Sequence, residues 1–239
     1  MNGVLVLWDI DHTLIHGGGA GRRLYPAVFR ELFGRELPEA AAMAGRTDRA
    51  IIAETLAMAG VAEPARHVDA FLAGLAGQAP ELLARLVTEG GRALPGALAA
   101  LAAVAGPPPA AVQSVLTGNV PAIAEAKLTA FGLAAYLDLA IGAYGDHHES
   151  RAELVHLARR RAAAAYGRDF QGQGTVLIGD TPLDVAAALA TGARAVGVAT
   201  GSATAAELAA AGAHAVLPDL TDTAAVLAAL LGTPTPAPA

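Results

Sequence analysis

The stretch that decides the fold reads Val4-Leu5-Val6-Leu7-Trp8-Asp9-Ile10-Asp11-His12-Thr13-Leu14. Its five consecutive apolar residues predict a short strand that is buried on both faces. Asp9 and Asp11 follow at the carboxyl end of this strand, and residues two apart in an extended chain lie on the same face. Because ligands bind at this end of the strands in open α/β sheets, we expect both carboxylates to face one crevice.

Two carboxylates at this spacing repel each other, and proteins commonly hold such a pair with a divalent cation. A turn in which aspartate serves only the backbone is the alternative interpretation for an isolated Asp-x-Asp. The spacing of Asp9 and Asp11 leaves both interpretations open, and the rest of the chain has to decide between them.

The overall composition disfavours several classes of protein. The 239 residues suffice for one large domain or two smaller ones, and a net charge of −6 disfavours a nucleic-acid-binding surface. The chain is 54% hydrophobic, but no apolar run reaches the ~20 residues of a membrane span, and Asp9 interrupts the first run, which favours a strand over a signal peptide. The absence of cysteine suggests a reducing, cytoplasmic compartment. Without a Gly-Lys-Ser/Thr sequence, a Walker A phosphate loop is excluded.

Two glycine-rich segments divide the chain. One is Gly17-Gly18-Gly19-Ala20-Gly21, which does not fit a dinucleotide-binding loop because the third required glycine falls on Arg22. The other is Gly90-Gly91. Between them, apolar residues recur at helical spacing and convincing strands are missing. We therefore expect an all-helical cap over residues 16–92 with glycine-rich hinges, inserted into an α/β core of residues 1–15 and 93–232.

From residue 93 onward, short apolar strands alternate with helices, which predicts a parallel sheet with helices on both faces. The expected strands cover residues 111–116, 137–141, 175–178, 193–198 and 214–217. The expected helices cover residues 95–105, 120–131, 151–166, 182–190, 203–211 and 220–231. Three prolines at 107–109 predict a rigid break, and residues 233–239 predict a disordered tail.

Three of the expected strands end in residues that can carry chemistry. Besides the first strand with its two aspartates, one ends in Thr117-Gly118-Asn119 and another in Gly179-Asp180-Thr181-Pro182-Leu183-Asp184. Each segment alone also fits a plain turn or a helix start, with Thr181 as the N-cap residue. A parallel sheet would bring all three ends to one edge, so their joint appearance in this order favours a shared site.

In these motifs the chain resembles the haloacid dehalogenase-like (HAD) hydrolase superfamily, and in particular its phosphoglycolate-phosphatase-like phosphatases with a helical cap. The Asp-x-Asp-x-Thr motif of the family reads Asp9-Ile10-Asp11-His12-Thr13, its strand that ends in Thr or Ser reads Val115-Leu116-Thr117-Gly118-Asn119, and its Gly-Asp-x-x-x-Asp reads Gly179 to Asp184. The resemblance extends over about residues 4–231 and implies a Rossmann-like core with an inserted cap.

The resemblance and the chemistry of the side chains imply the same roles for the acids. Asp9 would attack phosphorus and form an aspartyl phosphate, while Asp11 would protonate the leaving alcohol and later deprotonate a water. Asp9, the main-chain carbonyl of Asp11 and Asp180 would hold Mg²⁺. Asp184 would orient Asp180 or a metal-bound water.

The oxygens of the phosphoryl group need donors as well. The Thr117 hydroxyl and the nearby main chain of Gly118 and Asn119 would supply them. The family usually adds a lysine near the start of a later helix, but the only lysine here is Lys127. Arg151 stands at the expected helix start, so we assign this role to Arg151. Lys127 is the rival, which we expect to be too far away at about 12 Å along its helix from Asn119.

The cap contains one further candidate. In Gly45-Arg46-Thr47-Asp48, Arg46 is the expected cation on the leaving-group side of the substrate, while Thr47 or Asp48 could simply be a helix N-cap. The pair His147-His148 invites a metal interpretation, but adjacent side chains diverge, so we prefer a polar loop.

These features predict a Mg²⁺-dependent phosphatase that acts on a small phosphorylated metabolite through an aspartyl phosphate. A phosphoglucomutase of the same family is the alternative, because mutase and phosphatase differ in how well the closed cap excludes water. Asp11 disfavours a dehalogenase, and a cap without lysine disfavours a phosphonatase. A non-catalytic phospho-accepting or binding protein is the alternative from another class. We expect neither a nucleic acid nor a membrane as partner, and the sequence does not predict the oligomeric state.

Overall fold

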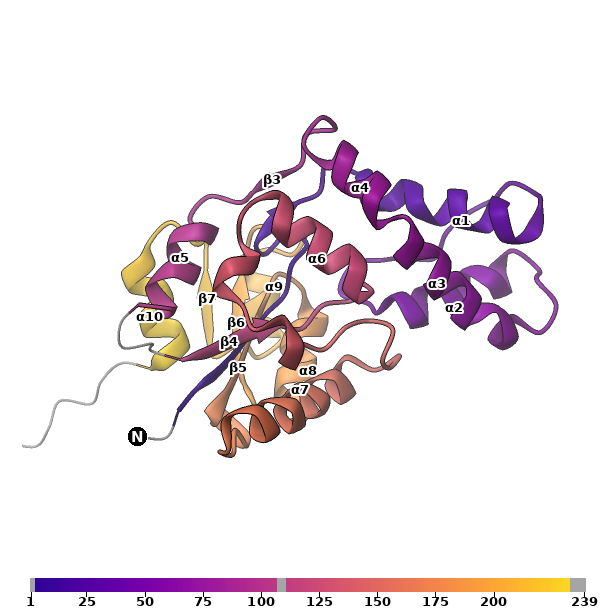
Figure 1. The fold of residues 1–239 in the computed structure, drawn as a ribbon. Helices are drawn as coiled ribbons and strands as arrows, with labels where there is room; N and C mark the ends of the chain where they lie inside the picture. The colour runs from indigo at the N-terminus through magenta and orange to yellow at the C-terminus, as the bar shows by residue number, and fades with distance from the viewer. Residues whose placement is uncertain (1–2, 107–110, 233–239) are drawn as a thin grey trace, which may run out of the picture.

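A parallel sheet forms the centre of the computed structural model, which describes residues 3–106 and 111–232 (Figure 1). Its five strands lie in the order β4-β1-β5-β6-β7. Their bounds are Leu5–Trp8 for β1, Val112–Val115 for β4, Thr175–Gly179 for β5, Arg194–Val198 for β6 and Ala215–Leu217 for β7. Strand β1 pairs with β4 on one side and β5 on the other, so that Trp8 lies level with Val115 and Ile178. The ends of these three strands therefore meet at one edge.

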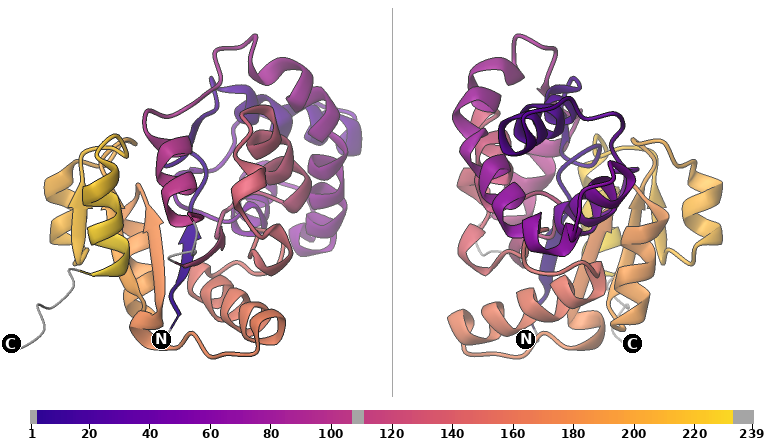
Figure 2. Two further views of the ribbon diagram at one scale, coloured as in Figure 1. Left: turned by 60° about the vertical axis from the view of Figure 1, so that its left-hand side comes forward. Right: turned by 90° about the vertical axis from the view of Figure 1, so that its right-hand side faces the viewer.

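Helices cover both faces of the sheet (Figure 2). They are α5 (Ala97–Val104), α6 (Pro121–Ala130), α7 (Arg151–Tyr166), α8 (Pro182–Ala190), α9 (Ala205–Ala210) and α10 (Thr223–Leu231). Side chains alternate along β1, so that Val6 and Trp8 pack with α5 and α10, and Leu5 and Leu7 pack with α7, α8 and α9. This double coverage confirms the predicted α/β fold.

A helical layer of α1 to α4 lies beyond the carboxyl ends of the strands, at the right in Figure 1. Its helices are α1 (Leu24–Phe33), α2 (Asp48–Met58), α3 (Val68–Gly77) and α4 (Ala79–Leu86). Apolar residues at helical spacing form its own buried cluster, which includes Val28, Ile52 and Phe71. Val120 and Ile123 belong to the same cluster, because α6 packs against α3 and α4. The helical layer thus shares its core with α6, and a cap bounded at residues 16 and 92 stays a prediction.

Two short strands join the helical layer to the rest of the chain. Strand β2 (Ile15–His16) pairs antiparallel with β3 (Arg92–Ala93), so the two connections lie side by side. Gly18 has a φ of +61° there, and a Cβ at this position would overlap the carbonyl group of Glu89. Glycine at this predicted hinge therefore lets the two connections approach closely.

The expected strand over residues 137–141 is wrong. Within this region lies a turn of 3₁₀ helix, η4 (Leu139–Ile141), and another, η3 (Ala134–Tyr136), precedes it. The Asp138 side chain accepts a hydrogen bond from the Ala140 amide at 3.1 Å. A short apolar run does not separate strand from helix by its period, and a local Asx hydrogen bond decides here. Only a single parallel bridge between Leu116 and Ala143 remains at this edge of the sheet among the described residues. The predicted break at 107–109 and the predicted tail at 233–239 lie outside the described residues.

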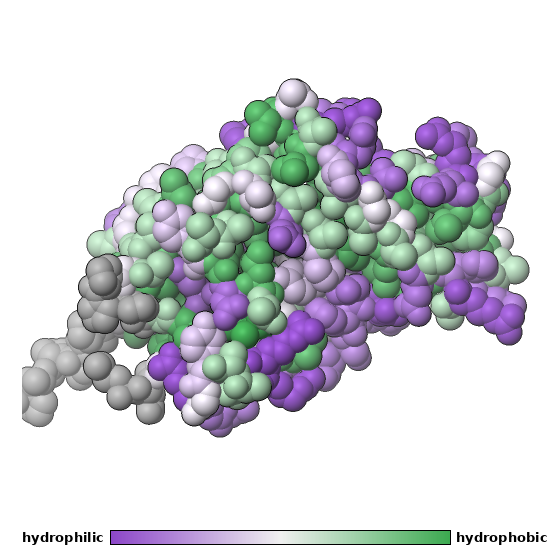
Figure 3. All heavy atoms as spheres, viewed as in Figure 1, coloured by the Kyte–Doolittle hydropathy of each residue, from purple (hydrophilic) through white to green (hydrophobic). Residues whose placement is uncertain are grey.

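Of the helices that the structure describes, none is long and apolar enough to cross a membrane. On the face shown in Figure 3, hydrophobic and hydrophilic residues are interleaved over the sheet, α6 and the helical layer. Apolar side chains therefore reach the surface among polar ones, as is usual for a folded protein.

Candidate active site

Three acids from two strand ends meet in a buried cluster. Asp9 follows β1, Asp180 follows β5, and Asp184 lies in the first turn of α8. One carboxylate oxygen from each of them lies within 4.8 Å of the other two. Thr13, which has no predicted role beyond its place in the first motif, lies fully buried beside them, and its hydroxyl is 3.4 Å from Asp9 Oδ2 and 3.5 Å from Asp180 Oδ1. The parallel sheet thus brings the predicted acids together.

Local helix capping fixes the position of Asp184. Thr181 is the N-cap of α8, and the two residues form a reciprocal capping box. The Thr181 hydroxyl donates to Asp184 Oδ2 at 2.6 Å, which leaves Oδ1 free to meet other groups. A Cβ at Gly179 would overlap the Asp184 carboxyl group, so glycine is required at the end of β5. The helix-start interpretation of this motif is therefore confirmed, and the same capping box holds Asp184 beside the other two acids.

The cluster carries an electrostatic cost that a cation would relieve. Burial raises the pKa of Asp9 to about 7, and the neighbouring Asp184 adds to the shift. Burial also raises the pKa of Asp180 to about 8, and the negative charge of Asp9 is the second cause of this shift. Three carboxylate oxygens are the hard donors that divalent cations such as Mg²⁺, Mn²⁺ or Ca²⁺ prefer. The residues present therefore fit a divalent metal ion.

Arg151 supplies a fixed positive charge to one side of this cluster. It begins α7, and its Nη2 donates to Asp9 Oδ1 at 2.8 Å and also to Asp184 Oδ1. Burial alone would lower the pKa of the Arg151 guanidinium, but Asp184 and Asp9 outweigh burial and raise this pKa. The structure thus places Arg151 against the predicted nucleophile, as expected from its position at the helix start.

Lys127 also reaches the site, and the expectation that it lies too far away is wrong. Its Nζ is 2.7 Å from Asp11 Oδ2, 2.8 Å from Asp11 Oδ1 and 2.9 Å from Asn119 Oδ1. The length of α6 gave the predicted separation from Asn119, but α6 packs against the helical layer and thereby directs Lys127 toward Asp11. Two cations therefore serve the site, one at each predicted catalytic acid.

The loop after β4 connects these groups. The side-chain Nδ2 of Asn119 donates to Asp11 Oδ2 and to Thr117 Oγ1, both at 2.7 Å. Burial would raise the pKa of Asp11, but Lys127 and Asn119 outweigh burial and lower it. A Cβ at Gly118 would overlap the carbonyl oxygen of Arg46, so glycine allows the start of α2 to approach this loop. Of the three predicted substrate-binding residues of the loop, Asn119 thus contacts Asp11 directly, Thr117 is linked to it through Asn119, and Gly118 lies against the start of α2.

Arg46 is differently placed. Its guanidinium pairs with Glu54 Oε2 at 2.6 Å and donates to the carbonyl groups of Ala42 and Ala50. It lines a groove of about 600 Å³ between the start of α2, the start of α7 and α8, which Arg151 and Leu183 also line. Within the described residues, no hydrogen bond joins Arg46 to the acids, and its role toward a substrate stays a prediction.

The adjacent histidines serve their own loop. His147 Nδ1 accepts a hydrogen bond from the Tyr144 amide at 3.1 Å, and His148 Nδ1 accepts one from the Ser150 amide at 2.9 Å. These bonds occupy one ring nitrogen of each residue and agree with the preferred interpretation as a polar loop.

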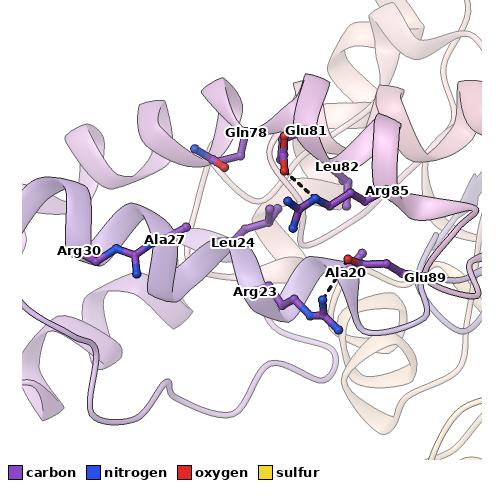
Figure 4. Close-up of a pocket in the computed structure, with 10 residues that line it drawn as sticks. All are labelled: Ala20, Arg23, Leu24, Ala27, Arg30, Gln78, Glu81, Leu82, Arg85 and Glu89. Carbon is purple, nitrogen blue, oxygen red and sulfur yellow. Dashed lines mark hydrogen bonds and ion pairs between the residues drawn. The ribbon is translucent and has the colours of Figure 1, made fainter.

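A second hollow, of about 220 Å³, lies within the helical layer between α1 and α4 (Figure 4). Arg23 pairs there with Glu89 at 3.0 Å, and Arg85 pairs with Glu81 at 2.6 Å. The charges that Figure 4 shows around this hollow are thus largely matched by one another, whereas the acids at the sheet edge are not. The acid cluster is the stronger candidate for chemistry.

Comparison with known proteins agrees with this geometry. The family model for haloacid dehalogenase-like hydrolases matches residues 6–189, so the chain belongs to that family and is a hydrolase. Similar folds include a hydrolase from Pseudomonas syringae, with 18% identity, a TM-score of 0.64, and coverage of 93% of this chain and 96% of that one. A predicted phosphoglycolate phosphatase from Haemophilus somnus has 16% identity, a TM-score of 0.64, and coverage of 95% of this chain and 98% of that one.

A third similar structure is a proposed beta-phosphoglucomutase from Bacteroides vulgatus, with 17% identity, a TM-score of 0.61, and coverage of 96% of this chain and 90% of that one. At these identities the similarity establishes the fold, and the reaction has to be argued from the site. No curated protein matches the chain.

Proposed function

We propose that this protein is a Mg²⁺-dependent phosphatase that hydrolyses a small phosphorylated metabolite through an aspartyl phosphate at Asp9. The observation that carries the proposal is the buried cluster of Asp9, Asp180 and Asp184 with Arg151 bonded to one oxygen of Asp9. Phosphoryl transfer depends mainly on positioning and on neutralising charge, and this cluster offers both.

Asp9 has one oxygen suited to attack. Arg151 holds Asp9 Oδ1 at 2.8 Å, while Oδ2 has, among the residues that the structure describes, only the long 3.4 Å contact from the Thr13 hydroxyl. A carboxylate oriented in this way can form a new bond to phosphorus as the bond from phosphorus to the leaving oxygen breaks. Asp9 and Asp180, with the main-chain carbonyl of Asp11, would hold Mg²⁺, which would neutralise a phosphoryl oxygen as the anions approach each other. Asp184, which is bonded to Arg151, would orient Asp180 or a metal-bound water.

Asp11 is suited to handle the protons. Lys127 and Asn119 hold its carboxylate, and its lowered pKa keeps it ionised in the free protein. In the first step a nearby phosphate would raise this pKa, so that Asp11 can carry a proton to the leaving alcohol. In the second step the ionised carboxylate would take a proton from the attacking water. Thr117 and the main chain of the same loop would bind the remaining phosphoryl oxygens.

A phosphomutase is the second candidate, and one observation favours it. The start of α2 lies tightly over the loop after β4, with the Asp48 amide donating to the Gly118 carbonyl at 2.7 Å. A helical layer held against the catalytic loop in this way would limit the access of water and so favour transfer of the phosphoryl group to a second hydroxyl. Release of inorganic phosphate, compared with transfer to an added sugar phosphate, distinguishes the two reactions.

The test is hydrolysis of p-nitrophenyl phosphate by the purified protein with Mg²⁺ and with EDTA. We expect turnover only with the metal, and loss of turnover in Asp9→Asn. Asp69→Asn is the matched control, because its side chain is 85% exposed and pairs with Arg49 on the surface. An inactive wild type contradicts the proposed enzyme, and an active Asp9→Asn variant contradicts the proposed nucleophile.

The absence of cysteine supports a cytoplasmic location for this activity.

A further inference from the structure

We propose that Asp48 is a positioning residue of the active site: its carboxylate accepts the main-chain N–H of Val120 and thereby holds the loop that carries Thr117 and Asn119. The inference rests on the proposed phosphatase function. It assigns a catalytic consequence to a residue of the helical layer that contacts neither the metal-binding acids nor, in this geometry, the reacting atoms.

The carboxylate of Asp48 is turned away from its own helix. Asp48 is the first residue of α2, but Thr47 is the N-cap and accepts the hydrogen bond from the Ala50 amide. Asp48 Oδ2 instead accepts from the Val120 amide at 2.8 Å, and Oδ1 accepts from the Tyr25 hydroxyl at 2.6 Å. Both oxygens of a buried acid are thus used to join α2 to α1 and to the start of α6.

The charge of Asp48 is balanced by these donors. Burial raises its pKa to about 6, while the hydrogen bonds from Tyr25 and Val120 and the charge of Lys127 oppose the shift and Asp11 adds to it. The hydrogen bonds from Tyr25 and Val120 thus offset part of the cost of burying this carboxylate.

Main-chain contacts place α2 directly against the loop. The Asp48 amide donates to the Gly118 carbonyl at 2.7 Å, and the Arg49 amide donates to the Gly145 carbonyl at 3.0 Å. A Cβ at Gly145 would overlap the carbonyl group of Gly118. The loop after β4 is therefore confined between α2 on one side and the segment that leads to α7 on the other.

The confined loop leads directly to the chemistry. Val120, whose amide Asp48 binds, is adjacent to Asn119 in the chain, and Asn119 contacts both Thr117 Oγ1 and Asp11 Oδ2. Lys127 then closes the network on Asp11. If Asp48 lost its carboxylate, the buried Val120 N–H would lose its partner, and the loop would have to shift to satisfy it.

The test compares three variants on one helix. Asp48→Ala removes the acceptor, whereas Asp48→Asn keeps a carbonyl oxygen for Val120 and an amide for Tyr25. Thr55→Ala is the matched control, because Thr55 is fully buried in α2 and its hydroxyl accepts the amide of buried Ala41 at 3.0 Å. Both variants leave a buried main-chain N–H without its partner, but only the N–H of Val120 adjoins the catalytic loop. Asp48→Ala also removes the acceptor of the Tyr25 hydroxyl, and Tyr25→Phe measures that loss separately.

A displacement of about 1 Å in an active site costs roughly 100-fold in rate, so we expect kcat/KM to fall by roughly 10- to 100-fold in Asp48→Ala. Asp48→Asn should stay within about threefold of the wild type, and Thr55→Ala should lower Tm without a comparable loss in kcat/KM. Unchanged kcat/KM in Asp48→Ala, or an equal loss in Thr55→Ala, overturns the proposal.

Amide hydrogen exchange provides a readout that does not depend on turnover. We expect the amide of Val120 to lose protection in Asp48→Ala and to keep it in Thr55→Ala. If the wild type proves inactive toward phosphate esters, the proposed function fails, and the exchange measurement still tests the structural link. Full protection of Val120 in Asp48→Ala overturns that link whatever the activity.

Discussion

Two cations reach the candidate site from different parts of the fold, and they differ in what holds them there. Arg151 comes from the α/β core and meets Asp9 and Asp184, and the side chains of all three are at most 8% exposed. Lys127 comes from α6, which packs into the helical layer, and it meets Asp11, whose side chain is 36% exposed. The acid proposed as nucleophile is therefore fixed within the core, whereas the acid proposed to move protons depends on the helical layer. We expect these two halves of the site to respond differently to substitution.

The largest expected effect is on kcat, and it differs between substitutions of Asp9 and of Asp11. Asp9→Asn removes the proposed nucleophile and should lower kcat by roughly 10,000-fold or more. Asp11→Asn removes a general acid and base and should lower kcat by about 100- to 10,000-fold in both half-reactions. Single-turnover kinetics with p-nitrophenyl phosphate measure the attack by Asp9, and an alkyl phosphate, whose alcohol needs a proton in order to leave, measures the role of Asp11. Fast release of p-nitrophenol by Asp9→Asn would contradict the assignment, and an unaffected Asp11→Asn would contradict the role of the second acid.

In the metal-free protein, substitution of Arg151 should cost more stability than substitution of Lys127. Arg151→Ala leaves buried acids without a partner and should lower the free energy of unfolding by about 3–5 kcal/mol. Lys127→Ala leaves an acid that water can reach and should cost about 1–3 kcal/mol. Urea denaturation in EDTA measures both values.

Arg66→Ala is the control for this comparison, because the exposed ion pair of Arg66 with Glu63 should contribute less than about 1 kcal/mol. Equal costs for Arg151→Ala and Lys127→Ala would show that the two halves of the site are not distinct.

The smallest expected effect concerns pH and metal. Because the pKa values of Asp9 and Asp180 are raised to about 7 and about 8, the folded protein favours their protonated forms. Their contribution to stability is complete below the unfolded pKa of about 3.9 and is lost as the pH rises through about 7 to 8. Mg²⁺ competes with these protons, so the increase in Tm on adding Mg²⁺ should grow from about pH 5 to about pH 8.

Asp180→Asn should flatten this dependence of the Tm increase on pH, since it removes one of the two groups that bind both a proton and the metal. An increase in Tm that is the same at every pH in the wild type would contradict the binding of metal to these acids.

The Arg151 half of the site could be predicted because local rules determine it. Parallel strands bring the residues after β1 and β5 to one edge of the sheet. The capping box of Thr181 and Asp184 then holds Asp184 in the first turn of α8, four residues after Asp180. Helix α7 begins at Arg151 as predicted, and the family resemblance, which puts a cation near the start of this helix, assigned the side chain to the site.

The Lys127 half could not be predicted in the same way. The direction of α6 is set by the packing of Val120 and Ile123 into the helical layer, and no local pattern in α6 encodes this contact. The hydrogen bond from Val120 to Asp48 could not be predicted either, because it joins residues 72 positions apart that share no sequence motif. The strand that was wrongly predicted over residues 137–141 has a local cause instead: the Asp138 side chain caps a turn of 3₁₀ helix there.

The most direct measurement is chemical trapping of the proposed intermediate. An acyl phosphate is reduced by borohydride to an alcohol, so an aspartyl phosphate at Asp9 becomes homoserine. Enzyme that is quenched during turnover, reduced and digested should show homoserine at residue 9 by mass spectrometry, and only when substrate and Mg²⁺ were both present. Phosphate release without modification of Asp9, or with homoserine at another aspartate, would contradict the account.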